Sequence, residues 1–416
     1  MPTLLVKNAL CLATMDDRGN EIAGGGFFAR DGVIEVVGPS VDLPRTADTV
    51  LDLAGHVVIP GLVNTHHHLF QSLTRVVPGG QDARLFGWLT ACYPIWQRLR
   101  PEHIYVSAVT GLAELMLSGC TTSSDHLYLF PNGSRLEDEI EAATDLGIRF
   151  HAMRGSMSKG QSKGGLPPDS LVEDEQLILR DSRRVIEAWH DPKPFSMLQV
   201  GLAPCTPFTV SEDLMRETAA LARSTGVRLH THTAENGEDV AYCAEKFGLR
   251  PVEYVERLGW TGADTWHAHC VELDDAEIGR FAASRTGVAH CPCSNMRLAS
   301  GIAPIRRMID SSVPVGLGVD GSASTDSGHL LNEARQAMLL QRVGGDPKGL
   351  TGREALRLAT RGGAEVLGRA AEIGQLRPGY AADFAAYDMG TIEMAGAAQF
   401  DPVAALVFCG PVQASH

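Results

Sequence analysis

Chain positions 60–68 read PGLVNTHHH, a short apolar run that ends in three consecutive histidines. The apolar run has the length of one β-strand, and side chains alternate between the two faces of a strand. His66 and His68 therefore point to one side of the chain, while His67 points to the other. Two imidazoles on one face form a natural pair of metal ligands, although a polar loop with chance histidines explains the run equally well.

Seven further apolar segments follow, and most are separated by stretches with helical patterns. We expect strands at residues 60–65, 121–125, 149–153, 196–202, 227–231, 265–269, 287–290 and 315–319. Between them, Pro101 opens a periodic apolar segment that Gly119 ends, and Ser211 caps another that Gly226 ends. Eight strand–helix units in succession predict a (β/α)8 TIM barrel.

The two ends of the chain show a different pattern. Residues 1–59 contain short strand-like runs, with the hairpin signal Asp31-Gly32 between two of them. We expect residues 1–59 and 371–416 to form the two parts of a small β-sandwich domain around a hydrolase barrel of residues 60–370. The second part stops at His416 without a closing pair of strands, so we expect a truncated domain.

The composition excludes several classes of protein. The net charge is −14, which repels phosphate backbones, so we expect no nucleic-acid partner. No run of eighteen apolar residues occurs, so we expect no membrane partner. The nine cysteines form no disulfide-like framework and the start of the chain does not resemble a signal peptide, so we expect a cytoplasmic protein.

Four more chemically active residues fall at the ends of later predicted strands. His232 and Glu235 end the fifth strand, His269 ends the sixth and Asp320 ends the eighth. Active sites of such barrels assemble at the carboxyl ends of the strands. Because a buried His or Asp without a partner is costly, this coincidence favours a metal site over chance histidines.

The order H-x-H, H-x-x-E, H and D resembles the amidohydrolase superfamily, in its branch of cytosine, guanine and S-adenosylhomocysteine deaminases and chlorohydrolases. Residues 53–66 and 290–301 also resemble signatures of this family, and the resemblance covers essentially the whole chain. It implies one zinc ion per chain, or one ferrous iron, held by His66, His68, His232 and Asp320.

The resemblance also implies a mechanism of hydrolytic deamination. Water activated by the metal would attack the carbon that bears the amine of a small heterocyclic substrate. Glu235 would shuttle protons, His269 would orient the attacking oxygen or stabilise charge, and Asp320 would accept a proton as well as bind metal. Members of the family commonly form dimers or larger assemblies, so a homo-oligomer is compatible with the sequence.

Within this branch the chain resembles the 8-oxoguanine deaminases, through residues 67–75, 81–89, 93–96 and 320–324. That resemblance implies conversion of 8-oxoguanine to urate and ammonia. The alternatives are an s-triazine chlorohydrolase or aminohydrolase, and a deaminase of isoxanthopterin, guanine or S-adenosylhomocysteine. A non-catalytic scaffold with a structural zinc is a further alternative, but three His, one Asp and an adjacent Glu suit an open catalytic site better.

Four residues in loops after the strands are candidates for binding the substrate: Gln81, Trp88, Arg154 and Cys205. Gln81 would read the edge of a ring through its amide, and Trp88 would stack on the ring unless it packs in a helix core. Arg154 would bind a carbonyl oxygen or, equally, form a salt bridge. Cys205 would form a small apolar wall.

Overall fold

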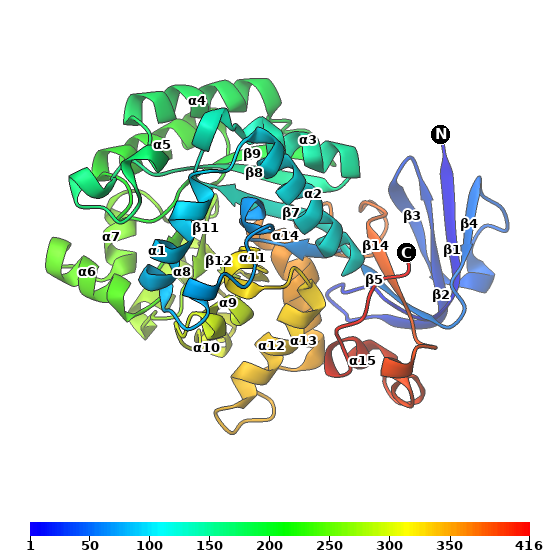
Figure 1. Ribbon diagram of the computed structural model, residues 1–416. Helices are drawn as coiled ribbons and strands as arrows, with labels where there is room; N and C mark the ends of the chain where they lie inside the picture. The colour runs from blue at the N-terminus through cyan, green and yellow to red at the C-terminus, as the bar shows by residue number, and fades with distance from the viewer. The chain divides into compact units, whose positions relative to one another are not determined.

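The computed structural model describes residues 1–416 and closes eight strands into a barrel. The barrel strands are β6 (Leu62–Asn64), β7 (Cys120–Leu127), β8 (Arg149–Ser156), β9 (Leu198–Pro204), β10 (Leu229–Thr233), β11 (Thr265–His269), β12 (Gly287–His290) and β13 (Val315–Leu317). Their order around the barrel is β10-β11-β12-β13-β6-β7-β8-β9, with parallel pairing from β8 through β13. Each of the eight predicted segments overlaps one of these strands, so the predicted TIM barrel is confirmed (Figure 1).

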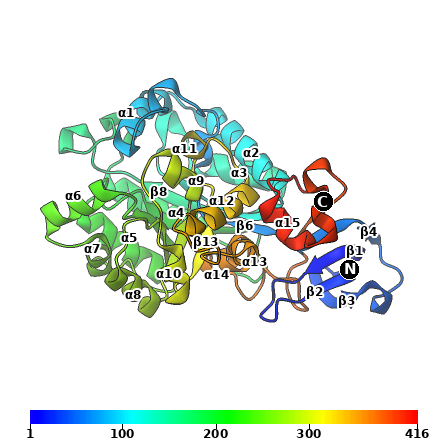
Figure 2. The same cartoon turned by 90° about the horizontal axis from the view of Figure 1, so that it is seen from below.

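Helices follow most of the barrel strands. They are α1 (Leu85–Trp96), α2 (Pro101–Leu117), α3 (Leu136–Leu146), α4 (Glu175–Trp189), α5 (Glu212–Thr225), α6 (Gly237–Phe247), α7 (Pro251–Arg257), α8 (Asp275–Ser284), α9 (Pro292–Arg297), α10 (Ile305–Asp310), α11 (Ser322–Thr325), α12 (Leu330–Arg342), α13 (Gly352–Arg357), α14 (Gly363–Val366) and α15 (Pro402–Phe408). Helices α4 and α5 lie outside β8 and β9 in Figure 1, and Figure 2 shows α7 and α8 at the outer edge of the barrel.

Helix α5 shows how the sequence sets the ends of these helices. The Ser211 hydroxyl accepts a hydrogen bond from the backbone N–H of Leu214, which satisfies one of the free donors of the first turn. At the other end Gly226 adopts a left-handed backbone with φ +73°, a conformation that glycine adopts without strain. Both predicted ends of this helix are therefore confirmed.

Strands from both ends of the chain form a second sheet. Its strands are β1 (Thr3–Ala13), β2 (Glu21–Arg30), β3 (Val33–Pro39), β4 (Thr49–Asp52), β5 (His56–Pro60) and β14 (Phe384–Asp388). They follow the order β14-β5-β1-β2-β3, and β4 pairs with β1. The predicted hairpin turn is present, with φ +49° at Asp31 and +76° at Gly32. Buried apolar residues such as Val6, Phe27 and Val58 give this sheet a core of its own.

The chain divides into two compact units. One contains residues 1–64, 114–122 and 329–416, and the other contains residues 65–113 and 123–328. All the side chains of the candidate site lie in the second unit. The domain boundaries expected at 59/60 and 370/371 stay predictions. No helix of the chain combines the length and the apolar character that crossing a membrane requires.

Candidate active site and metal centre

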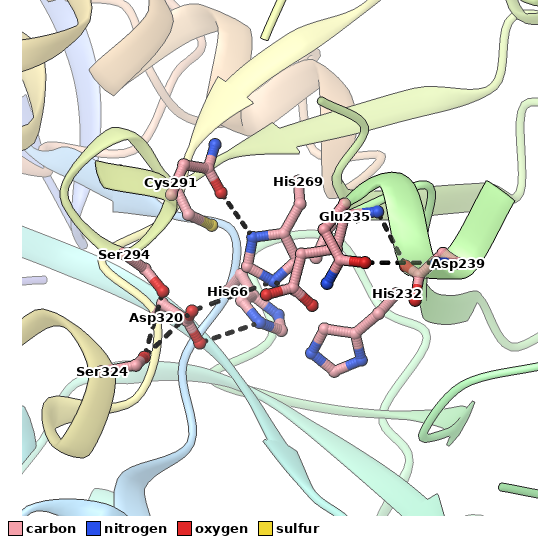
Figure 3. A network of polar contacts seen from close by, with 12 residues as sticks. His66, His232, Glu235, Asp239, His269, Cys291, Ser294, Asp320 and Ser324 are labelled. Atoms are coloured by element: carbon pink, nitrogen blue, oxygen red, sulfur yellow. Dashed lines mark hydrogen bonds and ion pairs between the residues drawn. The ribbon is translucent and has the colours of Figure 1, made fainter. Parts of the chain in front are cut away.

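Four polar side chains meet at the carboxyl end of the barrel strands. His66 and His68 follow β6, His232 lies in β10 and Asp320 follows β13. The Nε2 atoms of His68 and His232 are 3.1 Å apart, and Asp320 Oδ1 lies 3.3 Å from His66 Nε2 and 3.5 Å from His68 Nε2. All four side chains are buried, and Figure 3 shows Asp320 beside the imidazole of His66, with that of His232 nearby.

The backbones that carry the first and last of these residues are bonded to each other. Thr65 donates from its backbone N (2.9 Å) and from its hydroxyl (2.8 Å) to the carbonyl of Leu317. Asp320 donates from its backbone N to the carbonyl of His66 at 3.1 Å. These bonds fix the position of the His66 and Asp320 backbones before any metal binds.

The hydrogen bonds of two imidazoles show which ring nitrogen carries the proton. His68 Nδ1 lies 2.7 Å from the carbonyl oxygen of His126, and His232 Nδ1 lies 2.6 Å from that of Cys205. A carbonyl oxygen only accepts, so both Nδ1 atoms are protonated. Burial lowers the pKa of His68 to about 3 and that of His232 well below its usual value, so both rings are neutral. Their Nε2 atoms therefore carry lone pairs.

These lone pairs point at one another without a proton between them. His66 contributes a further Nε2 atom that is buried and has no hydrogen-bond partner. Three nitrogens and one carboxylate oxygen at such short distances repel one another unless a cation lies between them. Nitrogen and oxygen donors in a set of four suit zinc. The residues present therefore fit the metal that the sequence implied.

Two further ionisable residues lie beside this cluster. His269 Nε2 is 3.8 Å from Glu235 Oε2 and 3.8 Å from Asp320 Oδ2, and its Nδ1 is 2.9 Å from Asn295 Oδ1. Burial raises the pKa of Glu235 to about 7, with Asp239 adding to the rise. Burial alone would lower the pKa of His269, but the charges of Glu235 and Asp320 raise it above its usual value.

The backbone is strained at the same place. Ala234, His269, Cys270 and Asp320 all have positive φ angles, between +51° and +69°. Residues other than glycine rarely adopt this conformation, and such strain clusters at active sites. Near these positions, the side chains of Glu235, His269 and Asp320 point toward one another (Figure 3).

A buried pair of carboxyl groups is bonded to the segment that carries the histidines. Asp125, in β7, accepts a hydrogen bond of 2.6 Å from the backbone N of Leu69, the residue after His68. The carboxyl group of Asp125 also lies beside that of Glu139 in α3. Burial raises the pKa of Asp125 to about 7 and that of Glu139 well above its usual range. The pair therefore retains a proton near neutral pH.

This pair should make the stability of the protein fall with rising pH. Both pKa values are higher in the folded than in the unfolded chain, so the stabilisation is complete below pH about 4 and is lost as the pH rises through about 7. Glu139→Gln should weaken this dependence, because an amide donates to Asp125 without a titrating proton. Melting temperatures measured from pH 5 to pH 9 test it, with the exposed Glu141→Gln as the matched control. Equal pH dependence in parent and Glu139→Gln would contradict the shared proton.

A pocket opens onto the cluster and is lined mainly by apolar and aromatic side chains. About 480 Å³ of space free of atoms, part of it open to solvent, lies between the lining residues. Trp88, Tyr93, Tyr128 and Phe208 contribute aromatic rings. No Lys or Arg lines the pocket, so its walls suit a flat, uncharged molecule.

The structure brings two of the four residues predicted to bind substrate to this pocket. Trp88 and Cys205 line it, and the Trp88 indole N–H donates to the carbonyl of Ala323 at 2.9 Å. Gln81 is exposed, donates to the carbonyl of Val76 and does not line the pocket.

Arg154 does not line the pocket either. Its buried guanidinium donates to both oxygens of Glu173 (2.9 and 2.7 Å), to Asp181 (3.1 Å) and to the carbonyl of Gly155 (2.7 Å). It also lies 4.3 Å from the centroid of the Phe130 ring. Arg154 therefore fixes the segments that follow β8, in keeping with the salt-bridge alternative.

Sequence reasoning missed two residues of the site. Gln71 is buried and lines the pocket, with an unpaired Oε1 atom and a 3.4 Å contact from its Nε2 to the Tyr128 hydroxyl. A polar amide three residues after His68 was the available signal. His126 stacks on His232 with ring centroids 5.0 Å apart, but nothing in its spacing indicated that place.

Comparison with known proteins places this site among enzymes that act on heterocycles. Residues 57–411 match the model of the amidohydrolase family. An 8-oxoguanine deaminase of Pseudomonas aeruginosa is 42% identical over 414 residues, which cover 99% of this chain and 91% of the relative. A hydroxydechloroatrazine ethylaminohydrolase of a Pseudomonas species is 39% identical, over 99% of this chain and 89% of the relative.

A solved structure extends this likeness to three dimensions. The atrazine chlorohydrolase of Arthrobacter aurescens, crystallised in complex with zinc, superposes with a TM-score of 0.94 at 35% identity. The match covers 99% of this chain and 93% of that protein.

Proposed function

The chain belongs to the amidohydrolase family, and from that premise we propose that it is a zinc-dependent deaminase that converts 8-oxoguanine to urate and ammonia. It is a metal-dependent hydrolase of C–N bonds in heterocycles. The observation that carries the proposal is the proton-free set of nitrogen and oxygen donors, with Glu235 and His269 beside it on an aromatic pocket. The likeness to the 8-oxoguanine deaminase supports the choice of ring.

His66, His68, His232 and Asp320 are the residues proposed to hold one zinc ion, with ferrous iron as the alternative. A bound zinc ion lowers the pKa of a coordinated water from about 15.7 toward about 7, which supplies a nucleophile at neutral pH. Lone pairs on His68 and His232 and the buried Nε2 of His66 support this set.

Glu235 is proposed to carry the protons of the reaction. With a pKa of about 7 it is present in both protonation states near neutral pH, as a proton carrier must be. Water adds its oxygen to the carbon that bears the amine, and Glu235 delivers a proton to the neighbouring ring nitrogen. A second proton passes to the amine, the C–N bond breaks and ammonia leaves.

His269 and Asp320 are proposed to assist at the same carbon. The raised pKa of His269 favours its charged form, which stabilises the negative charge that develops on the attacked ring. Asp320 Oδ2 lies 3.8 Å from His269 Nε2 and accepts a hydrogen bond of 3.2 Å from the Ser324 hydroxyl. Its remaining lone pair is proposed to accept a proton from the attacking water.

The pocket walls are proposed to select the ring. Trp88 and Cys205 would contact the faces and edges of the base, and the unpaired amide oxygen of Gln71 would accept a hydrogen bond from a ring N–H. The absence of Lys and Arg from the pocket wall favours a neutral base over substrates with carboxylate or phosphate groups.

Gln71→Leu should lower kcat/KM for 8-oxoguanine by about 3–10-fold, the equivalent of one neutral hydrogen bond worth ~0.5–1.5 kcal/mol. The same substitution at Gln81, Gln81→Leu, should have a smaller effect, since that side chain does not line the pocket. Steady-state kinetics of the two variants decide between the positions. A larger loss at Gln81 would return the assignment to the residue that the sequence suggested.

The substrate is tested by ammonia release from guanine, 8-oxoguanine, isoxanthopterin, adenosine and a chlorotriazine. The highest kcat/KM with 8-oxoguanine, together with urate as product, would support the proposal. Chloride release from the triazine would favour the second candidate, a chlorohydrolase, which the similarity to the zinc-bound atrazine enzyme keeps open. No turnover of any ring would favour the structural-zinc scaffold.

A further inference from the structure

One histidine lies between the proposed ligand His66 and the backbone of the neighbouring strand. His66 Nδ1 is 2.7 Å from His230 Nε2, and His230 Nδ1 is 3.0 Å from the carbonyl oxygen of Trp266. All three residues are fully buried. The two contacts form a chain of hydrogen bonds from the ligand to the main chain of β11.

The Trp266 carbonyl, at one end of this series of hydrogen bonds, determines where each proton lies. Since the Trp266 carbonyl only accepts, His230 Nδ1 carries a proton. A neutral imidazole carries one proton, so with Nδ1 protonated the Nε2 atom of His230 has a lone pair. That lone pair accepts the proton of His66 Nδ1. The Nε2 atom of the neutral His66 ring is therefore left without a proton.

Trp266 holds this arrangement at two further points. Its ring is stacked on the imidazole of His230, with centroids 4.5 Å apart and planes 17° from parallel. Its indole N–H donates to the carbonyl of Thr65 at 3.1 Å, and Thr65 is the residue immediately before His66. One side chain thus orients both the supporting imidazole and the backbone of the ligand.

We propose that His230 is a positioning residue that holds His66 in its metal-binding tautomer. The inference rests on the proposed function only in taking His66 as a ligand. His68 and His232 take the same support directly from main-chain carbonyls, which no substitution removes. His66 depends on a side chain, so its ligand state is the one that a single substitution can disrupt.

Two substitutions distinguish the role of His230 as a hydrogen-bond acceptor from its role in packing. His230→Phe keeps an aromatic ring against Trp266 but removes the acceptor, so we expect zinc affinity to fall about 10–100-fold, as is typical when such a partner of a ligand is lost. His230→Gln keeps an acceptor oxygen near His66 and should recover most of that loss. Competition with a chromogenic zinc chelator measures both, and the melting temperature of each metal-free protein shows whether it is folded.

A matched control guards against a general effect of burying phenylalanine. His290 is also fully buried, but neither of its ring nitrogens has a hydrogen-bond partner. His290→Phe should therefore leave zinc affinity near the parent value. Parent-like affinity in His230→Phe, or an equal loss in His230→Phe and His290→Phe, would overturn the positioning role.

A measurement without variants covers the case in which His230→Phe does not fold. Nitrogen-15 NMR of the metal-free parent should find His66 and His230 both protonated at Nδ1 and unprotonated at Nε2. An Nε2–H on either ring would overturn the inference. No substrate enters these experiments, so they stand or fall independently of whether 8-oxoguanine is turned over.

Discussion

Glu235→Gln is expected to lower kcat for ammonia release by about 10²–10⁴-fold while leaving the bound metal in place, because a positioned proton carrier contributes on that order. The glutamine fills the same buried space but cannot take up or deliver a proton. Glu235 lies beside His269, 3.8 Å away, and is not among the four residues proposed as ligands. This variant should therefore keep its metal content while its turnover falls.

Metal analysis and steady-state kinetics of the same preparation provide the measurement. Glu238→Gln is the matched control, since Glu238 is exposed on α6 three residues further along and should retain parent activity. Near-parent turnover in Glu235→Gln would contradict the proton-carrier role. Loss of metal together with activity would instead make Glu235 a part of the metal site.

Removal of the metal should abolish ammonia release, a loss of several orders of magnitude, since the nucleophile depends on it. The lone pairs of His68 and His232 and the carboxylate of Asp320 offer no substitute for a cation. Dialysis against a chelator followed by addition of zinc should restore turnover. The metal-free chain should also melt at a lower temperature, since binding to the folded state stabilises it.

The same preparation distinguishes the metals and tests the ligand set. Ferrous iron added without oxygen should restore less turnover than zinc if zinc is the native metal, and more if iron is. His232→Ala should not recover with stoichiometric zinc, because one of the four donors is missing. Full activity in a preparation shown to be free of metal would rule out the proposed mechanism.

The barrel could be predicted from the sequence because its strands are buried on both faces and are separated by helices with clear ends. The expected segments at 265–269 and 287–290 coincide with β11 and β12. No bounds were predicted for helix α1, and Pro94 lies inside it, where proline normally discourages a helix. Its packing, including the bond from Trp88 to Ala323, depends on a segment far along the chain.

Some residues of the candidate site could likewise be placed from the local sequence, whereas others depend on partners that are distant in the chain. Strand ends located His66, His232 and Asp320 on one face, because side-chain direction in a strand follows from position alone. The place of Arg154 depends on Glu173 and Asp181, which belong to a loop and a helix that no local pattern connects to β8. A charged residue at a strand end is therefore ambiguous until its partners are known.

The hydrogen bonds from Thr65 to Leu317 join the residue that follows β6 to the last residue of β13. These two strands are neighbours in the closed barrel. These two residues are 252 positions apart in the chain. A cation bound by both His66 and Asp320 would cross-link two segments that are far apart in the chain. Cross-links that close long loops are expected to stabilise the folded state most, because closing a longer loop costs more chain entropy. A fragment that lacks either the first or the last barrel strand could not form the metal centre. Tight metal binding would therefore indicate that the complete barrel has assembled.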